Sequence, residues 1–520
     1  MAVFSGLPAT AQILIGLLFA YALYSITASI TLWRRRQAIK SERGCQSVPW
    51  AANQVDHIFG IDLFLKTVKA VKNHTMLATV QQAFLTTDVK TMQFVTLGVH
   101  MFRTIEPENL KTIQAIDHAK WGLPANRKAA IAPLFGKGIF TNDGAAWQHS
   151  RDMLRPNFVR SQVGDVLTFE KHVSPLIKTI QESPSEDLSE LFFLLSMDSA
   201  TEFLFGQSTD SLSKNSEQRA GGFGEAFDQA QKLVSHHARF GKLTRLFPAD
   251  KRFKQSVGII NDFVDKFVIK ALDAKSQSDS EKPASENGRY VFIDELVRQT
   301  NDPVVIRSEL LNVLLAGRDT TASLLTNVFF TISQRPEIWQ RLQADVQQLN
   351  GALPTFEQLK DLKYVKAVLN ESLRCHPIVP INSRQALEDT ILPLGGGPDG
   401  KSPFFAKKGS IVSWNLYVMH RRKDLYGEDA EEFKPERWLD NAETGQKGIR
   451  PTWEYLPFNG GARICIGQQF GLAEASYTVV RLCQAFSGIK CNAPGPWIEN
   501  VNLTCMNLSG AKVTLTPRAI

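Results

Sequence analysis

Ten residues near the C-terminal end place one cysteine in a setting that suits a metal-bound thiolate. Residues 458–467 read FNGGARICIG, so Cys465 follows a glycine pair and an arginine and precedes a helical run. Glycines let a tight loop approach a flat macrocycle, and backbone N–H groups of that loop can hydrogen-bond a thiolate. The N-terminal end of the helix that starts near residue 468 also stabilises a sulfur anion. The pattern predicts that Cys465 is a thiolate ligand, with Arg463 placed to pair with a carboxylate.

Two other interpretations of Cys465 compete with the thiolate ligand. A lone cysteine is commonly a small buried apolar residue. A cysteine hydrolase would use Cys465 with a histidine base, for which His376 and His420 are candidates. That chemistry leaves the surrounding glycine and arginine pattern unexplained.

Two helical segments carry polar residues whose positions suggest a structural or chemical role. Glu371 and Arg374 in NESLRCHP are three positions apart, so they share one helical face and can form an ion pair. The apolar helix LLNVLLAGRDTTASLL contains a polar patch that includes Asp319 and Thr320. A threonine bonded to its own helix, with an aspartate at a surface turn, is the structural alternative for that patch.

The cysteine segment resembles the haem-binding signature of the cytochrome P-450 superfamily, FxxGxRxCxG. All the defined positions match, namely Phe458, Gly461, Arg463, Cys465 and Gly467. The resemblance implies a mainly α fold with a small β portion, and haem b as the cofactor with Cys465 as axial iron ligand. A thiolate in that position favours cleavage of the O–O bond.

The same resemblance gives roles to the two helical segments. FKPERW, which contains Arg437, is similar to the superfamily's later arginine motif, so Arg437 would lock Glu371 and Arg374 for folding and haem seating. Asp319 and Thr320 would relay protons on the distal side of the haem.

Three more side chains are implied as partners of the haem propionates. Trp147 and Arg151 in WQHSR resemble the superfamily's WxxxR helix, and Arg384 in NSRQA is a third partner by the same analogy. Outside this context, such arginines are usually solvated surface charges.

Within the superfamily, LLNVLLAGRDTTASLL, CHPIVPINSR and LPLGGGPDGKSPFFAKKGS resemble the fungal alkane and fatty-acid terminal hydroxylases. This implies hydroxylation of a fatty acid, an alkane or a similar lipophilic substrate at or near the end of its aliphatic chain. The glycine run at 395–400 is expected to be a long loop facing the substrate. Ala316 stands where some animal fatty-acid hydroxylases carry a glutamate that esterifies the haem, so no covalent link is expected.

Two alternatives to that function stay open. A monooxygenase that tailors the alkyl part of a fungal secondary metabolite would share all these motifs. A haem protein without turnover would be expected to lose the proton relay, and Asp319 and Thr320 argue against that loss.

Electrons are expected from another protein, because no flavin or nicotinamide motif is visible in the chain. The resemblance implies an NADPH-dependent cytochrome P-450 reductase, with cytochrome b5 as a second candidate donor, so that NADPH and flavins act only through a partner. Basic side chains at Arg421, Arg422 and Lys423 are candidates for docking an acidic partner.

The first fifty residues differ from the rest. Residues 11–33 carry no charge and are long enough to cross a bilayer, and Arg34, Arg35 and Arg36 follow directly. The positive-inside rule then places the later residues in the cytosol, which suits an endoplasmic reticulum membrane protein. We expect a membrane anchor at 1–33, a basic linker at 34–50 and one catalytic domain at 51–520. A cleaved signal sequence would need basic residues before the apolar run.

Composition supports one large folded unit without a nucleic-acid partner. The 520 residues are 43% hydrophobic, and Lys plus Arg exceed Asp plus Glu by only 7, without a long basic run. The six cysteines form no CxxC pair, which indicates a reducing compartment rather than disulfides or structural zinc.

The elements that must position the candidate residues are mostly helices. Helical periodicity covers residues 145–160, 187–205, 253–274, 303–335, 337–349, 363–376 and 467–486. Strands are expected near 92–99, 411–419 and 512–517, and the Ser-rich stretch 276–288 is expected to be a surface loop.

Overall fold

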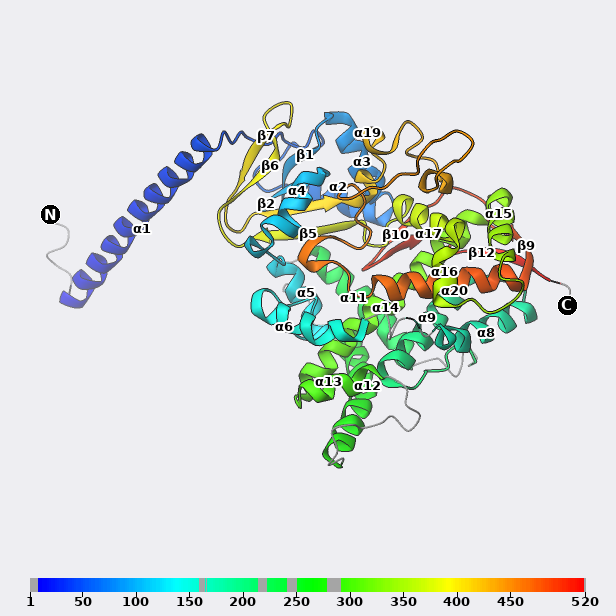
Figure 1. Ribbon diagram of the computed structural model, residues 1–520. Helices are drawn as coiled ribbons and strands as arrows, with labels where there is room; N and C mark the ends of the chain where they lie inside the picture. The colour runs from blue at the N-terminus through cyan, green and yellow to red at the C-terminus, as the bar shows by residue number, and fades with distance from the viewer. Residues whose placement is uncertain are drawn as a thin grey trace.

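The computed structural model describes residues 8–158, 164, 166–213, 222–240, 250–277 and 291–518. Helices form most of the body, the largest sheet lies at the end from which the first helix projects, and other short strands lie at the opposite end near the C-terminus (Figure 1). The helices are α1 (Ala9–Glu42), α2 (Ile61–Lys72), α3 (Met76–Thr87), α4 (Pro107–Lys111), α5 (Ala125–Phe135), α6 (Gly144–Leu154), α8 (Leu167–Glu182), α9 (Leu188–Phe205), α11 (Phe223–Phe240), α12 (Lys251–Gln277), α13 (Phe292–Gln299), α14 (Pro303–Ile332), α15 (Pro336–Gln347), α16 (Phe356–Asp361), α17 (Lys363–Cys375), α18 (Leu416–Met419), α19 (Lys423–Tyr426) and α20 (Gln468–Ala485). The predicted mainly α fold with a small β portion is confirmed.

The largest sheet has five strands in the order β1-β2-β8-β5-β3, with β2 and β8 parallel and the other pairs antiparallel. Smaller sheets pair β6 with β7, β10 with β11, and β12 with both β4 and β9. The strands are β1 (Thr91–Thr96), β2 (Val99–Thr104), β3 (Trp121–Gly122), β4 (Ser185–Asp187), β5 (Ile381–Ala386), β6 (Thr390–Gly396), β7 (Ser402–Ala406), β8 (Ile411–Asn415), β9 (Phe486–Cys491), β10 (Glu499–Val501), β11 (Cys505–Asn507) and β12 (Lys512–Pro517).

Helix α14 runs through the middle of the body. The Asp302 side chain caps its first turn by accepting from the backbone N–H of Val304, and Pro303 occupies the first helical position. The helix is apolar around most of its circumference and packs against α9, α12, α17 and α20. A helix that is apolar on all sides must be surrounded by protein, so the polar patch of α14 lies inside the molecule.

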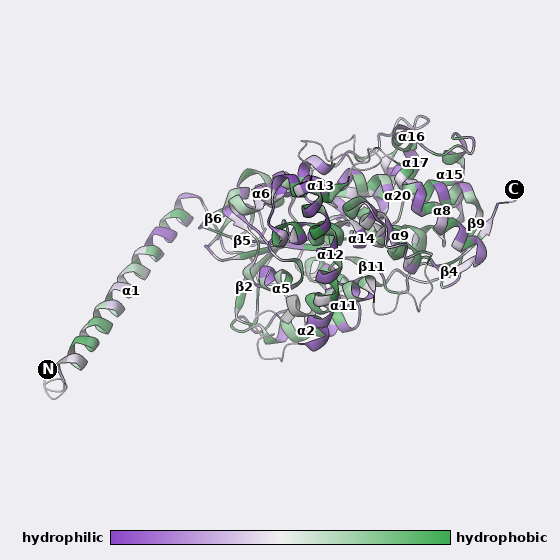
Figure 2. Ribbon diagram, turned by 90° about the horizontal axis from the view of Figure 1, so that it is seen from below, coloured by the Kyte–Doolittle hydropathy of each residue, from purple (hydrophilic) through white to green (hydrophobic). Residues whose placement is uncertain are grey.

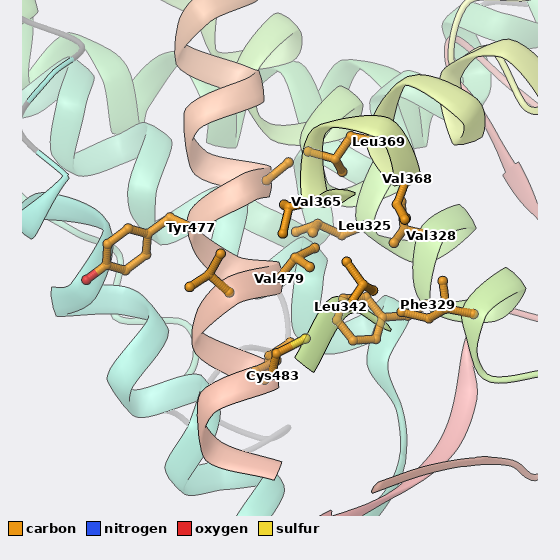
Figure 3. Close-up of a cluster of buried hydrophobic side chains, with 14 of the residues drawn as sticks. Leu325, Val328, Phe329, Leu342, Val365, Val368, Leu369, Tyr477, Val479 and Cys483 are labelled. Carbon is orange, nitrogen blue, oxygen red and sulfur yellow. The ribbon is translucent and has the colours of Figure 1, made fainter. Parts of the chain in front are cut away.

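One apolar cluster joins α14 to the helices behind the cysteine loop. Figure 3 shows side chains of α14, α15, α17 and α20 pointing toward one another, while Tyr477 points to the other side of α20. The labelled members are Leu325, Val328, Phe329, Leu342, Val365, Val368, Leu369, Tyr477, Val479 and Cys483. Their burial fixes α20, and therefore the loop before it, relative to α14.

Helix α1 is longer than the predicted anchor. Its segment Ile13–Glu42 is long and apolar enough to cross a membrane, with a mean hydropathy of 2.0, and none of its most apolar window is buried. The helix continues through the three arginines to Glu42, so the first half of the expected linker is helical. The second half, from Gln46, already contacts the body, because the Gln46 N–H donates to the Pro403 carbonyl.

Most of the predicted helices are present with small shifts at their ends, whereas α2, α3, α5, α8 and α11 were not predicted. Helices α5 and α8 contain Pro133 and Pro175, which usually end a helix. The expected strand at 411–419 is β8 followed by the helical turn α18. From residue 278 the expected loop lies outside the described residues, as do the last two residues of the helix expected at 145–160.

Candidate functional site

The loop from Phe458 to Cys465 is closed on itself and pressed against another segment. The Cys465 backbone N–H donates to the Phe458 carbonyl at 2.9 Å. Gly461 has φ +58°, and a Cβ there would lie 1.9 Å from the Gln114 carbonyl oxygen. The Gln114 side chain also accepts from the Gly460 N–H at 2.9 Å. Only glycine fits at Gly461, and the close approach that it permits in this structure is to Gln114.

The Cys465 thiol is deep in the protein and yet uncovered. Its side chain is exposed, while burial among surrounding protein raises the pKa of the thiol. An exposed side chain and a pKa raised by burial are compatible if the sulfur faces an open space inside the molecule instead of the outer surface. The Gly467 backbone N–H and the Arg151 charge oppose the rise and favour the thiolate.

Helix α6 brings its tryptophan and arginine to the cysteine loop. Trp147 is buried, and the Arg463 guanidinium lies over its ring at 4.4 Å from the centroid. Arg151 lies 5.8 Å from the same centroid and donates to the Ile464 carbonyl at 2.9 Å. The structure therefore gathers Trp147, Arg151, Arg463 and Cys465 in one place.

Cationic side chains outnumber anionic ones beside that loop. Asn382 accepts from Arg127 at 2.7 Å and from Arg384 at 3.3 Å, while Arg463 donates to Asp143 at 2.7 Å. Burial together with repulsion among the three guanidinium groups lowers the pKa of Arg384 to about 9 and that of Arg127 to about 10. Asp143 is the carboxylate that opposes this repulsion.

This excess of positive charge on buried and half-buried side chains suits a ligand that brings carboxylates of its own, as the propionates of haem would. With the uncovered Cys465 sulfur nearby, the residues present fit a haem. Sequence reasoning missed Arg127, and no local pattern marks it, because its contact residue Asn382 lies 255 positions away.

The polar patch of α14 divides into two parts. Thr320 is partly exposed and donates to the Ala316 carbonyl at 2.6 Å. This is the hydrogen bond to its own helix that was the alternative to a proton relay. Asp319 does not lie at a surface turn: it is buried and paired with Arg318 at 3.0 Å, and Arg318 also pairs with Asp228 of α11. Burial raises the pKa of Asp319 to about 6, although Arg318 opposes the rise.

Asp319 and Thr320 are neighbours in the chain but have different surroundings. Among the described residues, no hydrogen bond joins their side chains. Leu315, Ala316, Gly317 and Thr320 are partly exposed in the middle of α14, between buried stretches on either side, so this side of α14 borders an internal space. Asp319 instead belongs to the ion-pair cluster that connects α14 to α11.

Glu371 and its two arginines form one buried group. Arg374 donates twice to the Glu371 carboxylate, each at 2.8 Å, and Arg437 donates once at 2.9 Å. The backbone N–H of Lys434 and the indole of Trp438 supply two further hydrogen bonds. Burial works against the Arg374 charge, but its hydrogen bonds with Glu371 hold the Arg374 pKa above the usual value.

A buried carboxyl on α20 was not predicted. Glu474 is 2% exposed, and burial raises its pKa to about 7 against the effect of the Ser199 and Thr321 hydroxyls. No sequence signal marks it, because α20 reads as an ordinary amphipathic segment. Its neighbours come from α9 and α14, so its burial depends on how three helices pack.

The histidines proposed as a hydrolase base are engaged elsewhere. His420 Nε2 accepts from the Leu456 N–H at 3.1 Å, and burial lowers the pKa of His420 to about 3. His376 stacks on Trp497 with ring centroids 4.6 Å apart, and burial lowers its pKa.

The proposed basic docking residues are already ion-paired. Arg421 pairs with Glu431, Arg422 with Glu106 and Asp424, and Lys423 with Glu428. Arg421 is buried as well. Their positive charge is locally balanced, which weakens the case for a basic docking patch made from these three residues.

The glycine run at 395–400 does not form a long loop. It lies at the turn between β6 and β7, where Gly397 N–H donates to the Ser47 carbonyl at 3.0 Å. The expectation of a substrate-facing loop is corrected: this turn contacts the segment that follows α1.

Comparison with known proteins agrees with these features. The family model described as Cytochrome P-450 matches residues 70–507. The chain is 40% identical to the cytochrome P-450 monooxygenase FPY7 of Fusarium mangiferae, over 97% of this chain and 96% of that protein. It is 40% identical to cytochrome P-450 52A12 of Debaryomyces hansenii, over 92% and 94% of the two chains. It is 44% identical to cytochrome P-450 52A5 of Candida maltosa, over 77% of each.

Proposed function

The chain belongs to the cytochrome P-450 family of monooxygenases, and on this premise we propose that it hydroxylates an aliphatic chain at or near its end. The substrate would be a fatty acid, an alkane or a similar lipophilic molecule. The observation that carries the haem-thiolate chemistry is the Cys465 sulfur, which is deep, uncovered and near a group of buried and half-buried arginines.

The haem would be held by residues from several elements. Cys465 would bind the iron, and the Gly467 N–H would keep its sulfur in the thiolate form. Arg127, Arg384 and Arg463 would pair with the propionates, because their charges repel one another until carboxylates arrive.

A bound haem would supply an iron centre that activates dioxygen, places one oxygen atom in a C–H bond and releases the other as water, using two electrons and two protons. The chain would deliver the protons. Asp319, whose pKa is about 6, can hold or release a proton near neutral pH. The Thr320 Oγ1 hydroxyl, on the open side of α14, would pass a proton onward, while Glu371, Arg374 and Arg437 keep the fold around the haem in place.

Localisation and partners follow from α1 and from the lack of a flavin motif. We place the protein in the endoplasmic reticulum membrane through α1, with the body in the cytosol. An NADPH-dependent cytochrome P-450 reductase would supply the electrons, with cytochrome b5 as an alternative donor of the second one. A lipophilic substrate suits this location because it concentrates in the bilayer.

The first test is the difference spectrum of the reduced protein with carbon monoxide. We expect the red-shifted Soret band of a thiolate-bound haem in the natural protein and its loss in Cys465→Ser. Cys491→Ser is the control, because this cysteine is also partly accessible but lies on β9. An unshifted band in folded natural protein would refute the proposal.

A second measurement separates the substrate classes. The protein and a reductase are incubated with alkanes and with fatty acids, and the position of the new hydroxyl group is read by mass spectrometry. Terminal or near-terminal products would support the proposal. Absence of product with a normal carbon monoxide spectrum would favour the alternative function, tailoring of the alkyl part of a fungal secondary metabolite.

A further inference from the structure

One arginine of the largest sheet has no anionic partner. Arg103 lies on β2, and no group of the described residues accepts a hydrogen bond from its side chain or forms an ion pair with it. Its Nε atom is buried, and its guanidinium lies over the Phe94 ring of β1 at 4.6 Å from the centroid. A buried cation without a counter-charge is costly, so Arg103 is a candidate for binding an anionic ligand.

The Arg103 guanidinium is deep in the protein but not fully covered. Burial lowers the pKa of Arg103 to about 10, so the side chain is still charged at neutral pH. No carboxylate of the described residues opposes this shift. The residue is nevertheless partly accessible. As for Cys465, this combination indicates a side chain that faces an open space inside the molecule.

Arg103 belongs to a sheet face with other partly accessible residues. Residues that pair across neighbouring strands point to the same face, and residues alternate between the two faces along a strand. Arg103 pairs with Ser413 of β8, and Ser413 pairs with Ser383 of β5. The partly accessible residues of this face, called the Arg103 face, are Met101, Arg103, Ile381 and Ser383. Their neighbours on the opposite face are buried, namely Phe102, Thr104, Asn382 and Arg384.

The Arg103 face leads toward the polar patch of α14. The Ile378 carbonyl, shortly before β5, accepts from the Cys505 N–H at 2.9 Å. The Ser323 hydroxyl of α14 donates to the neighbouring Thr504 Oγ1 at 3.2 Å. Ser323 comes one helical turn after Thr320, whose side of α14 borders an internal space. The start of β5, the turn before β11 and the accessible side of α14 therefore meet at one place.

Arg103 is set back from that meeting place by the width of the sheet. Neighbouring strands are about 4.8 Å apart, so Arg103 on β2 lies about 10 Å from Ser383 on β5, with β8 between them. Figure 2 shows β2 and β5 at the end of the body from which α1 projects. A ligand whose head group binds Arg103 could extend its tail along the Arg103 face toward α14.

The ligand that fits this arrangement is a carboxylate with an apolar tail. A guanidinium can bind a carboxylate through two parallel N–H···O bonds, which supplies the counter-charge that Arg103 lacks. The nearest members of the same face, Met92, Phe94 and Met101, are apolar and suit an aliphatic chain. An alkane would leave the buried charge of Arg103 without a partner.

We propose that Arg103 binds the carboxylate of a fatty-acid substrate, so that the far end of the aliphatic chain is left for the haem iron. This inference rests on the proposed function and narrows its substrate class to fatty acids. Because the head group would be held at a distance from the iron, the position of the carboxylate would direct oxidation toward the end of the chain.

Binding of three matched ligands to the full-length holoprotein tests this. Dodecanoic acid, its methyl ester and dodecane share an apolar tail, and only the acid is ionised. Their affinities are measured from the change in the haem absorption spectrum. We expect the natural protein to bind the acid more tightly than the ester. Arg103→Gln should bind the acid about 10- to 100-fold more weakly, because charge-assisted hydrogen bonds are lost, with the ester unchanged.

A matched variant and a stability measurement guard against a general defect. Lys90→Gln removes a cation directly before β1 that already pairs with Asp88 at 4.0 Å, so it should bind the acid like the natural protein. Arg103→Met removes an uncompensated buried charge and should unfold at a higher temperature than the natural protein without ligand. Dodecanoic acid should raise the unfolding temperature of the natural protein more than that of Arg103→Met.

The results separate this inference from the proposed function. Unchanged acid binding in Arg103→Gln, or equal weakening of acid and ester, would overturn the role of Arg103 and leave aliphatic hydroxylation standing. If none of the three ligands changes the spectrum of a protein with a normal carbon monoxide band, the proposed function is overturned, and this inference with it.

Discussion

Replacing Glu371 with glutamine removes the negative charge from a group in which two arginines depend on it. The side chains of Glu371 and Arg374 are 0% exposed and that of Arg437 is 6% exposed, so water cannot compensate for the lost charge. Glutamine keeps the size of the side chain but offers a single acceptor oxygen. It also places an N–H₂ group toward donors.

The magnitude follows from this burial. Removing one member of a buried ion pair costs about 3–5 kcal/mol, because the partner charge stays buried without compensation. A folded protein is stable by about 5–15 kcal/mol in total, so a substantial share would be lost. Because Arg374 also donates to the carbonyls of His420, Ala430 and Glu432, we expect the folded state to persist at low temperature with weakened haem binding.

Thermal unfolding and haem content per chain measure this effect. The control is Glu436→Gln, because Glu436 also pairs with an arginine, Arg341, but its side chain is 41% exposed. An exposed pair contributes about 0–1 kcal/mol, so the control should resemble the natural protein. If Glu371→Gln and Glu436→Gln unfold at the same temperature with the same haem content, the reasoning from burial is refuted.

Other perturbations test separate parts of the site. The pKa of Glu474 is raised from 4.5 to about 7 in the folded protein, so the free energy of unfolding falls as the pH rises through this range. Relative to the natural protein, Glu474→Gln should therefore have a free energy of unfolding that is higher by about 3 kcal/mol at pH 8 and unchanged near pH 4. Equal increases at both pH values, measured by urea unfolding, would reject this. Gly461→Ala should lower haem content, since its Cβ would meet the Gln114 carbonyl at 1.9 Å, whereas Gly445→Ala, with positive φ but open space, should not. Asp319→Asn should reduce hydroxylated product about 100-fold while NADPH consumption continues, and an unchanged ratio of product to NADPH would count against the proton role.

The sequence alone determined the features that depend on neighbouring positions. The loop at 458–467 needs glycines and a following helix, and these are readable because the loop closes on itself between Phe458 and Cys465. The spacing of Glu371 and Arg374 places them on one helical face in any helix. The long helices were predictable because the spacing of their apolar residues, three or four positions apart, indicates both the helix and its buried side.

Only the tertiary structure decided which distant side chains share a space. Arg127 meets Asn382 across 255 positions, and Arg36 meets Asp389 across 353, and no local pattern in the chain links these partners. The surroundings of Asp319 also depended on packing, because it is buried and because Arg318, its ion-pair partner, pairs in turn with Asp228 of α11. Periodicity shows that a residue is buried, but the groups that surround it are set by how helices from different parts of the chain pack together.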